Sequence, residues 1–347
     1  MIVKYDISMQ INKRIIYLFS LFCLFLIVFS INSIFLSSSK EVEAKLFTIE
    51  KGQTVKEIAL NLKTEKLIKD QYAFIIYAAI SGKYTKIQAG EYLISSQMST
   101  AKIINLFTSG ETNKEKLTII EGWDLRDIAK YLEEKSITTE EEFYAITGKP
   151  TGENESVSTE NFNFLSDKPE NLSLEGYLFP DTYYINKTDG IDIIINKMLK
   201  NFDEKISSDL KDEIKRQKKT IFEIVTMASM IEKEVKTMED KKIVSGILWK
   251  RMDSGMRLQV DATVLYAQGD ENSKVYIKDT QINSPYNTYR NDGLPLGPIS
   301  NPGIDSVIAA VYPTKTAYYY YLSANDGTTI WSKTLEEHNR NKAKYLK

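Results

Sequence analysis

The sequence predicts an α+β protein in which a small strand-helix module and a larger mixed domain follow one apolar helix. Three observations support this fold class. The 347 residues give room for about two domains. A charge-free apolar run lies near the N-terminus, and a strand-turn-helix pattern occurs twice after it. With 42% hydrophobic and 27% charged residues, the composition excludes wholesale disorder and a fibrous repeat.

Charge and the scarcity of histidine and cysteine exclude several function classes. The 45 basic and 47 acidic side chains nearly cancel, so the chain lacks the basic excess of a general nucleic-acid binder. A single histidine and a single cysteine cannot supply a conventional Cys/His zinc site. They also argue against a disulfide scaffold and a Cys-His nucleophile pair. We therefore expect no metal and no cofactor.

The apolar run at residues 15–36 contains no charged residue, and as a helix it would be about 33 Å long. Three basic side chains and one acidic side chain precede it, so the positive-inside rule predicts a cytoplasmic tail at residues 1–14. We expect a single-pass protein of the cell membrane, with everything after Leu36 outside. The alternative is a cleaved signal peptide, but the run exceeds the usual length of about 7–15 residues and no A-x-A site follows. Cys23, inside the run, is expected to be a buried thiol rather than a lipoprotein site.

A strand, a glycine turn and an amphipathic helix are predicted at residues 48–62 and again, 70 positions later, at residues 119–132. Thr54 with Glu57, and Asp124 at the equivalent position of the second copy, are predicted helix N-caps. The first copy resembles a LysM-like module, and LysM modules bind glycans that contain N-acetylglucosamine. Glycan binding and a purely structural role both remain open for it.

These patterns divide the exported part of the chain into a LysM-like subdomain at residues 45–113 and a larger domain at residues 114–347. Near the C-terminus, residues 316–332 predict a β-hairpin with an Asn-Asp-Gly turn. Four consecutive tyrosines at residues 318–321 should alternate between the two faces of its first strand, two in the core and two exposed.

One helix, predicted at residues 220–235, carries a carboxylate on its apolar side. It opens with a Thr-x-x-Glu capping box from Thr220 to Glu223. At about 100° per residue, Glu232 falls inside an apolar arc of about 120°, whereas Glu234 falls on the face predicted to be exposed. Burial raises the pKa of a carboxylate, so Glu232 could act as a general acid. The alternative is a Glu232 at the edge of the stripe, bonded to neighbouring backbone or to an arginine.

Six motifs follow one another along the rest of the chain in a specific order and spacing. They are EGWDLRDIA (121–129), LEGYLFPDTY (174–183), ASMIEKE (228–234), GMRLQVDATVLYA (255–267), SPYNTYRNDGLPLGPISNPG (284–303) and the final Glu337, His338 and Asn339. With these motifs the chain resembles the endolytic murein transglycosylase family of bacterial envelopes, from the apolar segment to the C-terminus. The resemblance implies a membrane anchor, a LysM-like subdomain and a transglycosylase catalytic domain at residues 114–347.

The resemblance also implies the chemistry. The family's acid is the first glutamate of the E-K-E motif, which is Glu232 in this sequence. It would protonate the oxygen of the β-1,4 bond from MurNAc to GlcNAc, then accept the proton of the MurNAc 6-hydroxyl as that oxygen closes on C1. The product is a 1,6-anhydro end, made with one carboxylate where ordinary glycosidases use two. The implied partners are nascent peptidoglycan strands and, near the membrane, cell-wall synthases.

Eight residues in the motifs are candidates for binding the substrate: Gln259, Asp261, Thr263, Tyr286, Asn287, Thr288, Tyr289 and Glu175. Other roles stay open for several of them. Asp261 could cap the helix that follows it, residues 286–289 could serve only loop packing, and Glu175 could be a structural ion pair or cap. For His338 a positioning hydrogen bond is expected rather than proton transfer.

The sequence departs from the family pattern at three positions. Val260 and Ala262 stand where relatives often have serine and proline, and Leu296 replaces a common second proline. These changes lie beside the polar residues, so they affect loop shape more than chemistry. A second function from another class also remains open, namely a non-catalytic, membrane-anchored scaffold that binds peptidoglycan.

Overall fold

The computed structural model describes residues 21, 33–36, 44–109, 114–151, 154, 162–186, 189–269, 274–324 and 327–346. The chain forms two compact units, residues 1–115 and 116–347. Most of the predicted membrane segment and the whole predicted cytoplasmic tail lie outside the described residues. None of the helices within those described ranges is long and apolar enough to cross a membrane.

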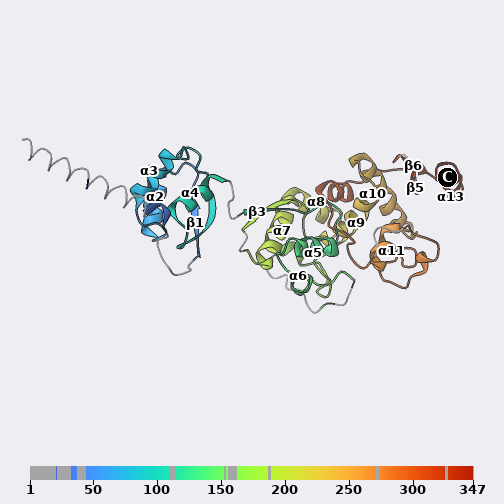
Figure 1. Cartoon of the computed structure of the whole chain (residues 1–347). Helices are drawn as coiled ribbons and strands as arrows, with labels where there is room; N and C mark the ends of the chain where they lie inside the picture. The colour runs from blue at the N-terminus through green and yellow to red at the C-terminus, as the bar shows by residue number, and fades with distance from the viewer. Residues whose placement is uncertain are drawn as a thin grey trace, which may run out of the picture. The chain divides into compact units, whose positions relative to one another are not determined.

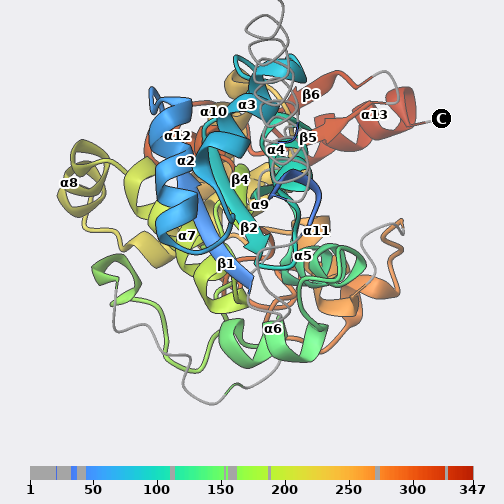
Figure 2. The same cartoon turned by 60° about the vertical axis from the view of Figure 1, so that its left-hand side comes forward.

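In the first unit, residues 44–109 form a two-stranded antiparallel sheet and three helices (Figures 1 and 2). Its strands are paired from Ala44 opposite Ser95 to Ile49 opposite Gly90, and aromatic rings of strands and helices form its core. The predicted capping box is confirmed, because Thr54 and Glu57 hydrogen-bond each other's backbone. The LysM-like interpretation of this unit stays a prediction. In chain order its elements are β1 (Ala44–Ile49), α2 (Val55–Thr64), α3 (Gln71–Ile80), β2 (Gly90–Ser95) and α4 (Thr100–Ser109).

The second unit is mostly helical and carries two further two-stranded sheets, β3 with β4 and β5 with β6. The mixed α+β class is therefore confirmed. Its elements are β3 (Lys114–Thr118), α5 (Leu125–Glu134), α6 (Glu140–Thr147), η1 (Asn163–Leu165), β4 (Thr182–Asn186), α7 (Ile191–Lys205), α8 (Ser208–Arg216), α9 (Ile221–Glu234), α10 (Met238–Asp253), α11 (Asp261–Gln268), η2 (Asp279–Gln281), α12 (Ile304–Val311), β5 (Tyr320–Ser323), β6 (Thr329–Ser332) and α13 (Leu335–Tyr345).

Helix α9 lies at the centre of the second unit. It begins where the sequence predicts, at a capping box between Thr220 and Glu223. Every residue from Ile224 to Ile231 is buried, because α8, α10, α11 and α12 all pack against the helix. The prediction of one buried stripe opposite an exposed face is therefore wrong for this helix. Only the last turn of α9 is partly open, where Lys233 is exposed and Glu234 is half-buried.

The turn and the helix of the second strand-turn-helix copy form as predicted, with Asp124 capping α5 through a capping box with Asp127, but the strand β3 ends at Thr118, before the predicted range. The β-hairpin also forms, with Tyr320 opposite Ser332 and Tyr321 opposite Trp331. Its tyrosines do not divide into two buried and two exposed, because all four are half-buried. Only two of them belong to β5, and each ring has a neighbour; the Tyr318 ring stacks on Trp331 and the Tyr320 ring on His338.

Close packing between α10 and the segment before β5 gives a testable stability effect. A methyl group added at Gly246 would clash with the carbonyl oxygen of Thr314, a backbone atom that cannot turn away. We expect Gly246→Ala to lower the free energy of unfolding by about 1–3 kcal/mol, as overpacking does. Denaturant unfolding would measure it, with Asp253→Ala at the exposed end of α10 as a near-neutral control. Equal stability of the two variants would contradict the close approach.

Candidate functional site

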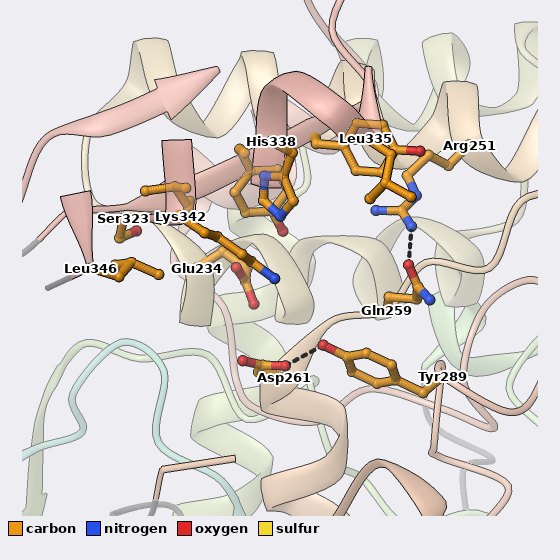
Figure 3. A pocket seen from close by; sticks show the side chains of 13 residues that line it. Glu234, Arg251, Gln259, Asp261, Tyr289, Ser323, Leu335, His338, Lys342 and Leu346 are labelled. Atoms are coloured by element: carbon orange, nitrogen blue, oxygen red, sulfur yellow. Dashed lines mark hydrogen bonds between the residues drawn. The ribbon is translucent and has the colours of Figure 1, made fainter. Parts of the chain in front are cut away.

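A cavity of about 540 Å³ opens in the second unit between the end of α9, the start of α11, the β5–β6 hairpin and α13 (Figure 3). Glu234, Gln259, Asp261 and Tyr289, which all belong to the sequence motifs, line it. The hairpin and α13 add Tyr320, Tyr321, His338 and Lys342, and α10 adds Arg251. Segments that are far apart in the sequence therefore meet at one pocket.

Glu234 is the last residue of α9, and the chain turns away immediately after it because Val235 is extended and buried. Its half-buried side chain lines the cavity (Figure 3). Burial raises the pKa of Glu234 to about 7, and the negative charge of Asp261 also raises it, whereas a hydrogen bond with Tyr321 lowers it. A carboxyl group with this pKa holds a proton for much of the time near neutral pH.

Gln259 and Asp261 form the side of the cavity next to α11. Gln259 has a φ of +54°, in the left-handed region that side chains other than glycine rarely adopt. Arg251 Nη2 donates to Gln259 Oε1 at 2.6 Å, which fixes the direction of the amide. Asp261 is the first residue of α11 but makes no capping bond; its Oδ1 accepts from the Tyr289 hydroxyl at 2.5 Å (Figure 3). Three of the eight predicted substrate-binding residues thus lie together beside Glu234.

Four other predicted residues lie beneath the surface and do not line this cavity. Thr263 and Thr288 share a hydrogen bond of 3.0 Å, and the Thr288 hydroxyl also accepts from the Val260 amide. Asn287 donates to two backbone carbonyls of its own loop. Tyr286 donates to the Pro150 carbonyl. Tyr286, Asn287 and Thr288 therefore have the alternative role, loop packing. Their hydrogen bonds hold the loop that carries Tyr289.

Glu175 is 2% exposed and does not line the cavity either. Its Oε2 accepts from the Leu125 amide at 3.1 Å and from the Tyr266 hydroxyl at 3.0 Å, and its Oε1 accepts from Asn301 Nδ2 at 3.1 Å. Burial raises the pKa of Glu175 well above its usual range. The carboxyl group links the start of α5 to α11 and to the loop before α12. Glu175 therefore stabilises the fold and does not face the cavity.

Glu232 is bonded to its neighbours, as in the alternative considered from the sequence, although the cation is a lysine and not an arginine. Lys241 Nζ, on α10, donates to both carboxylate oxygens at 3.1 and 3.2 Å, and both side chains are more than nine-tenths buried. The Gly303 amide and the Ser306 hydroxyl, at the start of α12, also donate to Glu232 Oε2, at 3.0 and 2.6 Å. Helix N-termini favour negative charge. Both carboxylate oxygens of Glu232 therefore accept hydrogen bonds from α10 or from the start of α12. Glu232 does not line the cavity, because it lies on the side of α9 against which these two helices pack.

The sequence patterns did not indicate Glu234, Arg251, the hairpin tyrosines or Lys342 as residues of the pocket. Glu234 lies in the same motif as Glu232, and apolar or small residues around the whole of α9 were a signal that this helix is buried. His338 was singled out, but its Nδ1 has no hydrogen-bond partner in the part of the chain that the structure describes. Across those same residues, no group of three histidine, cysteine, aspartate or glutamate side chains could hold a metal ion.

Comparison with known proteins identifies the family. The sequence description of the YceG-like family matches residues 47–344, which is most of the chain. The chain belongs to the YceG-like family. A Bacillus subtilis protein named endolytic murein transglycosylase is 36% identical over 307 residues, which cover 86% of this chain and 84% of that protein. A Streptococcus pneumoniae protein of the same name is 32% identical over 319 residues and 86% of this chain, but only 58% of that longer protein. The family recognised from the motifs is confirmed.

A solved structure has the same fold. The 2.6 Å crystal structure of a YceG-like protein from Listeria monocytogenes is 35% identical in sequence, with a TM-score of 0.58. The match covers 87% of this chain and all of that chain. The arrangement of helices and small sheets is thus similar in the two proteins.

Proposed function

We propose that this protein is an endolytic lytic transglycosylase that cuts the β-1,4 bond from MurNAc to GlcNAc inside peptidoglycan strands and leaves 1,6-anhydroMurNAc ends. One observation carries the proposal: Glu234, with a pKa near 7, faces a cavity that also holds Gln259, Asp261 and Tyr289. The names of the Bacillus and Streptococcus relatives support it. At about 540 Å³ the cavity is large enough for the sugars on either side of the bond.

The proposed acid is Glu234 rather than Glu232, the residue that the family resemblance indicated. Protonated Glu234 donates to the glycosidic oxygen as the bond from that oxygen to C1 breaks. The resulting carboxylate then takes the proton of the MurNAc 6-hydroxyl while its oxygen bonds to C1, which closes the anhydro ring and restores the acid. Glu232 cannot replace it without breaking the ion pair with Lys241.

The neighbouring polar groups would hold the sugar. Gln259 is fixed by Arg251 and Asp261 by Tyr289, so their free amide and carboxylate atoms are ready to bond hydroxyl or acetamido groups. Tyr320 and Tyr321, at the cavity wall, offer aromatic surface to a sugar ring.

We also propose that residues 15–36 anchor the protein in the cell membrane with the cavity outside, near cell-wall synthases, and that the first unit binds glycan as LysM-like modules do.

Product analysis tests the proposed activity. Full-length protein in detergent micelles, incubated with intact glycan strands, should release fragments with 1,6-anhydro ends that mass spectrometry identifies, shortening long strands from within. Binding without such products would favour the alternative, a non-catalytic scaffold.

A reporter fused after Lys347 that fluoresces only in the cytoplasm tests the topology; it should stay dark, and fluorescence would contradict the proposed orientation.

The pKa of Glu234 predicts the pH dependence of the reaction. The first step needs the protonated acid, so the rate should be constant well below pH 7 and fall about tenfold per pH unit well above it. Tyr321→Phe removes a hydrogen bond that lowers the pKa of Glu234, so its profile should shift to higher pH. Initial rates of anhydro product formation from pH 5 to 9 measure both profiles. A rate that rises through pH 7 would contradict the assigned acid.

A further inference from the structure

One side of the cavity is lined by basic side chains, and the mechanism above gives them no contact with the substrate. Arg251 from α10 and His338 from α13 lie along the upper side of the pocket in Figure 3, across from Asp261 and Tyr289. Arg251 is 6% exposed and His338 8% exposed, so both are more than nine-tenths buried. Lys342 follows His338 by four residues on α13, hence on the same face of that helix, and also lines the cavity.

Both buried side chains keep hydrogen-bonding capacity to spare. Arg251 donates from Nη2 to Gln259, but its Nε finds no acceptor within the described residues. His338 Nδ1 is equally without a partner there. Buried polar groups in folded proteins are nearly always bonded, so two buried nitrogens without a partner, on two side chains that line one cavity, indicate hydrogen-bonding capacity left for a ligand or water. Two independent elements, α10 and α13, contribute these unpaired atoms.

The charges around these groups favour an anion. Burial, followed by the positive charges of Lys342 and Arg251, lowers the pKa of His338, so the imidazole is neutral at pH 7 and can donate one hydrogen bond. Burial lowers the pKa of Arg251, but a guanidinium starts from so high a value that it stays positively charged in proteins. The planar guanidinium fits a group with two oxygens in one plane, which is the geometry of a carboxylate.

The aromatic wall indicates what lies beside that carboxylate. The Tyr320 ring stacks on His338, with centroids 5.4 Å apart, and lies 5.5 Å from the Arg251 guanidinium. It offers an apolar surface directly next to the cationic groups. A carboxylate on a short apolar stem, attached to a sugar, matches this combination better than a free inorganic anion does.

We propose that Arg251, His338 and Lys342 bind the carboxylate carried by the substituent on the 3-oxygen of the muramic sugar. The inference rests on the proposed function and names what that site recognises. It makes the three residues specificity determinants, which separate muramic glycans from neutral N-acetylglucosamine polymers. The carboxylate can come from the lactyl group of a peptide-free strand or from a stem peptide, and both have the same chemistry.

Calorimetry on the full-length Glu234→Gln protein in detergent micelles tests the subsite without turnover. The ligands are a MurNAc-containing tetrasaccharide with a free lactyl carboxylate, the same molecule with that group converted to the amide, and the same molecule carrying a stem peptide. We expect the free acid to bind about 10- to 100-fold more tightly than the amide, the difference that a charged hydrogen-bonded group makes. Tight binding of the peptide form alone would assign the carboxylate to the stem.

Variants locate the effect. Lys342→Gln and Arg251→Lys, each added to Glu234→Gln, should reduce the preference for the acid over the amide by at least about fivefold. Lys344→Gln, on the same helix but not at the cavity, should leave that preference unchanged. Equal affinity for acid and amide overturns the inference, and so does an equal loss in the Lys342 and Lys344 variants. Failure of the proposed function is a separate result, because it is the absence of anhydro products with the unmodified protein.

Discussion

Replacing Glu234 by glutamine is expected to lower the rate of 1,6-anhydro product formation about 10²- to 10⁴-fold, the usual contribution of a positioned general acid. Glutamine has the shape of the protonated acid and keeps a partner for Tyr321, but it has no proton to give to the glycosidic oxygen. The fold should survive, because Glu234 lies at the end of α9 and faces the cavity. Mass spectrometry of digested glycan strands measures the product, and circular dichroism follows the fold.

The matched control is Glu232→Gln, in the same helix and motif. It removes the ion pair with Lys241, so we expect a less stable protein whose remaining folded fraction still produces anhydro ends. The opposite pattern, full activity in Glu234→Gln and none in a stable Glu232→Gln, would restore the first glutamate of the motif as the acid. The pair of variants therefore separates the chemical role from the structural one.

The second large effect is on stability. Lys241→Met should lower the free energy of unfolding by about 3–5 kcal/mol, because it leaves a buried carboxylate without its cation. Lys241 is the cation that bonds both oxygens of Glu232. Glu121 lies in the same cluster, where burial and the charge of Glu232 raise its pKa and Lys241 lowers it. Chemical denaturation followed by circular dichroism measures the loss.

A double variant tests the cause of that loss. Glu232→Gln combined with Lys241→Met removes both charges, so it should be more stable than Lys241→Met alone. If the double variant is as unstable as the sum of the two single variants, the ion pair is not the source of the effect. The packing of the lysine stem against α9 would then be the remaining explanation.

Local structure was predictable from the sequence to a large extent. The capping boxes at Thr54, Asp124 and Thr220 form as expected, because a cap depends on side chains only three residues apart. The hairpin also forms as expected, because its two strands are close together in the sequence. Helix faces were predicted less well. The helical wheel of α9 assumed one buried side, and this assumption fails for a helix that four others surround.

The candidate site shows the same division. Gln259, Asp261 and Tyr289 were chosen from their motifs and do line the cavity. Thr263 and Glu175 were chosen on equal grounds, yet they lie buried in hydrogen-bond networks. A polar residue in a motif can bind a ligand or hold the loop that does, and spacing along the chain does not distinguish the two.

The sequence by itself determined the family, the capped helices, the hairpin and the motif that supplies the proposed acid. Only the tertiary structure decided which glutamate of that motif faces the cavity. Glu232 and Glu234 are two residues apart, so they point to different sides of α9. The partner on each side comes from a distant part of the chain, Lys241 and α12 for Glu232 and the hairpin for Glu234. The pKa of a carboxylate depends on its neighbours in space, and these are set by how the helices pack.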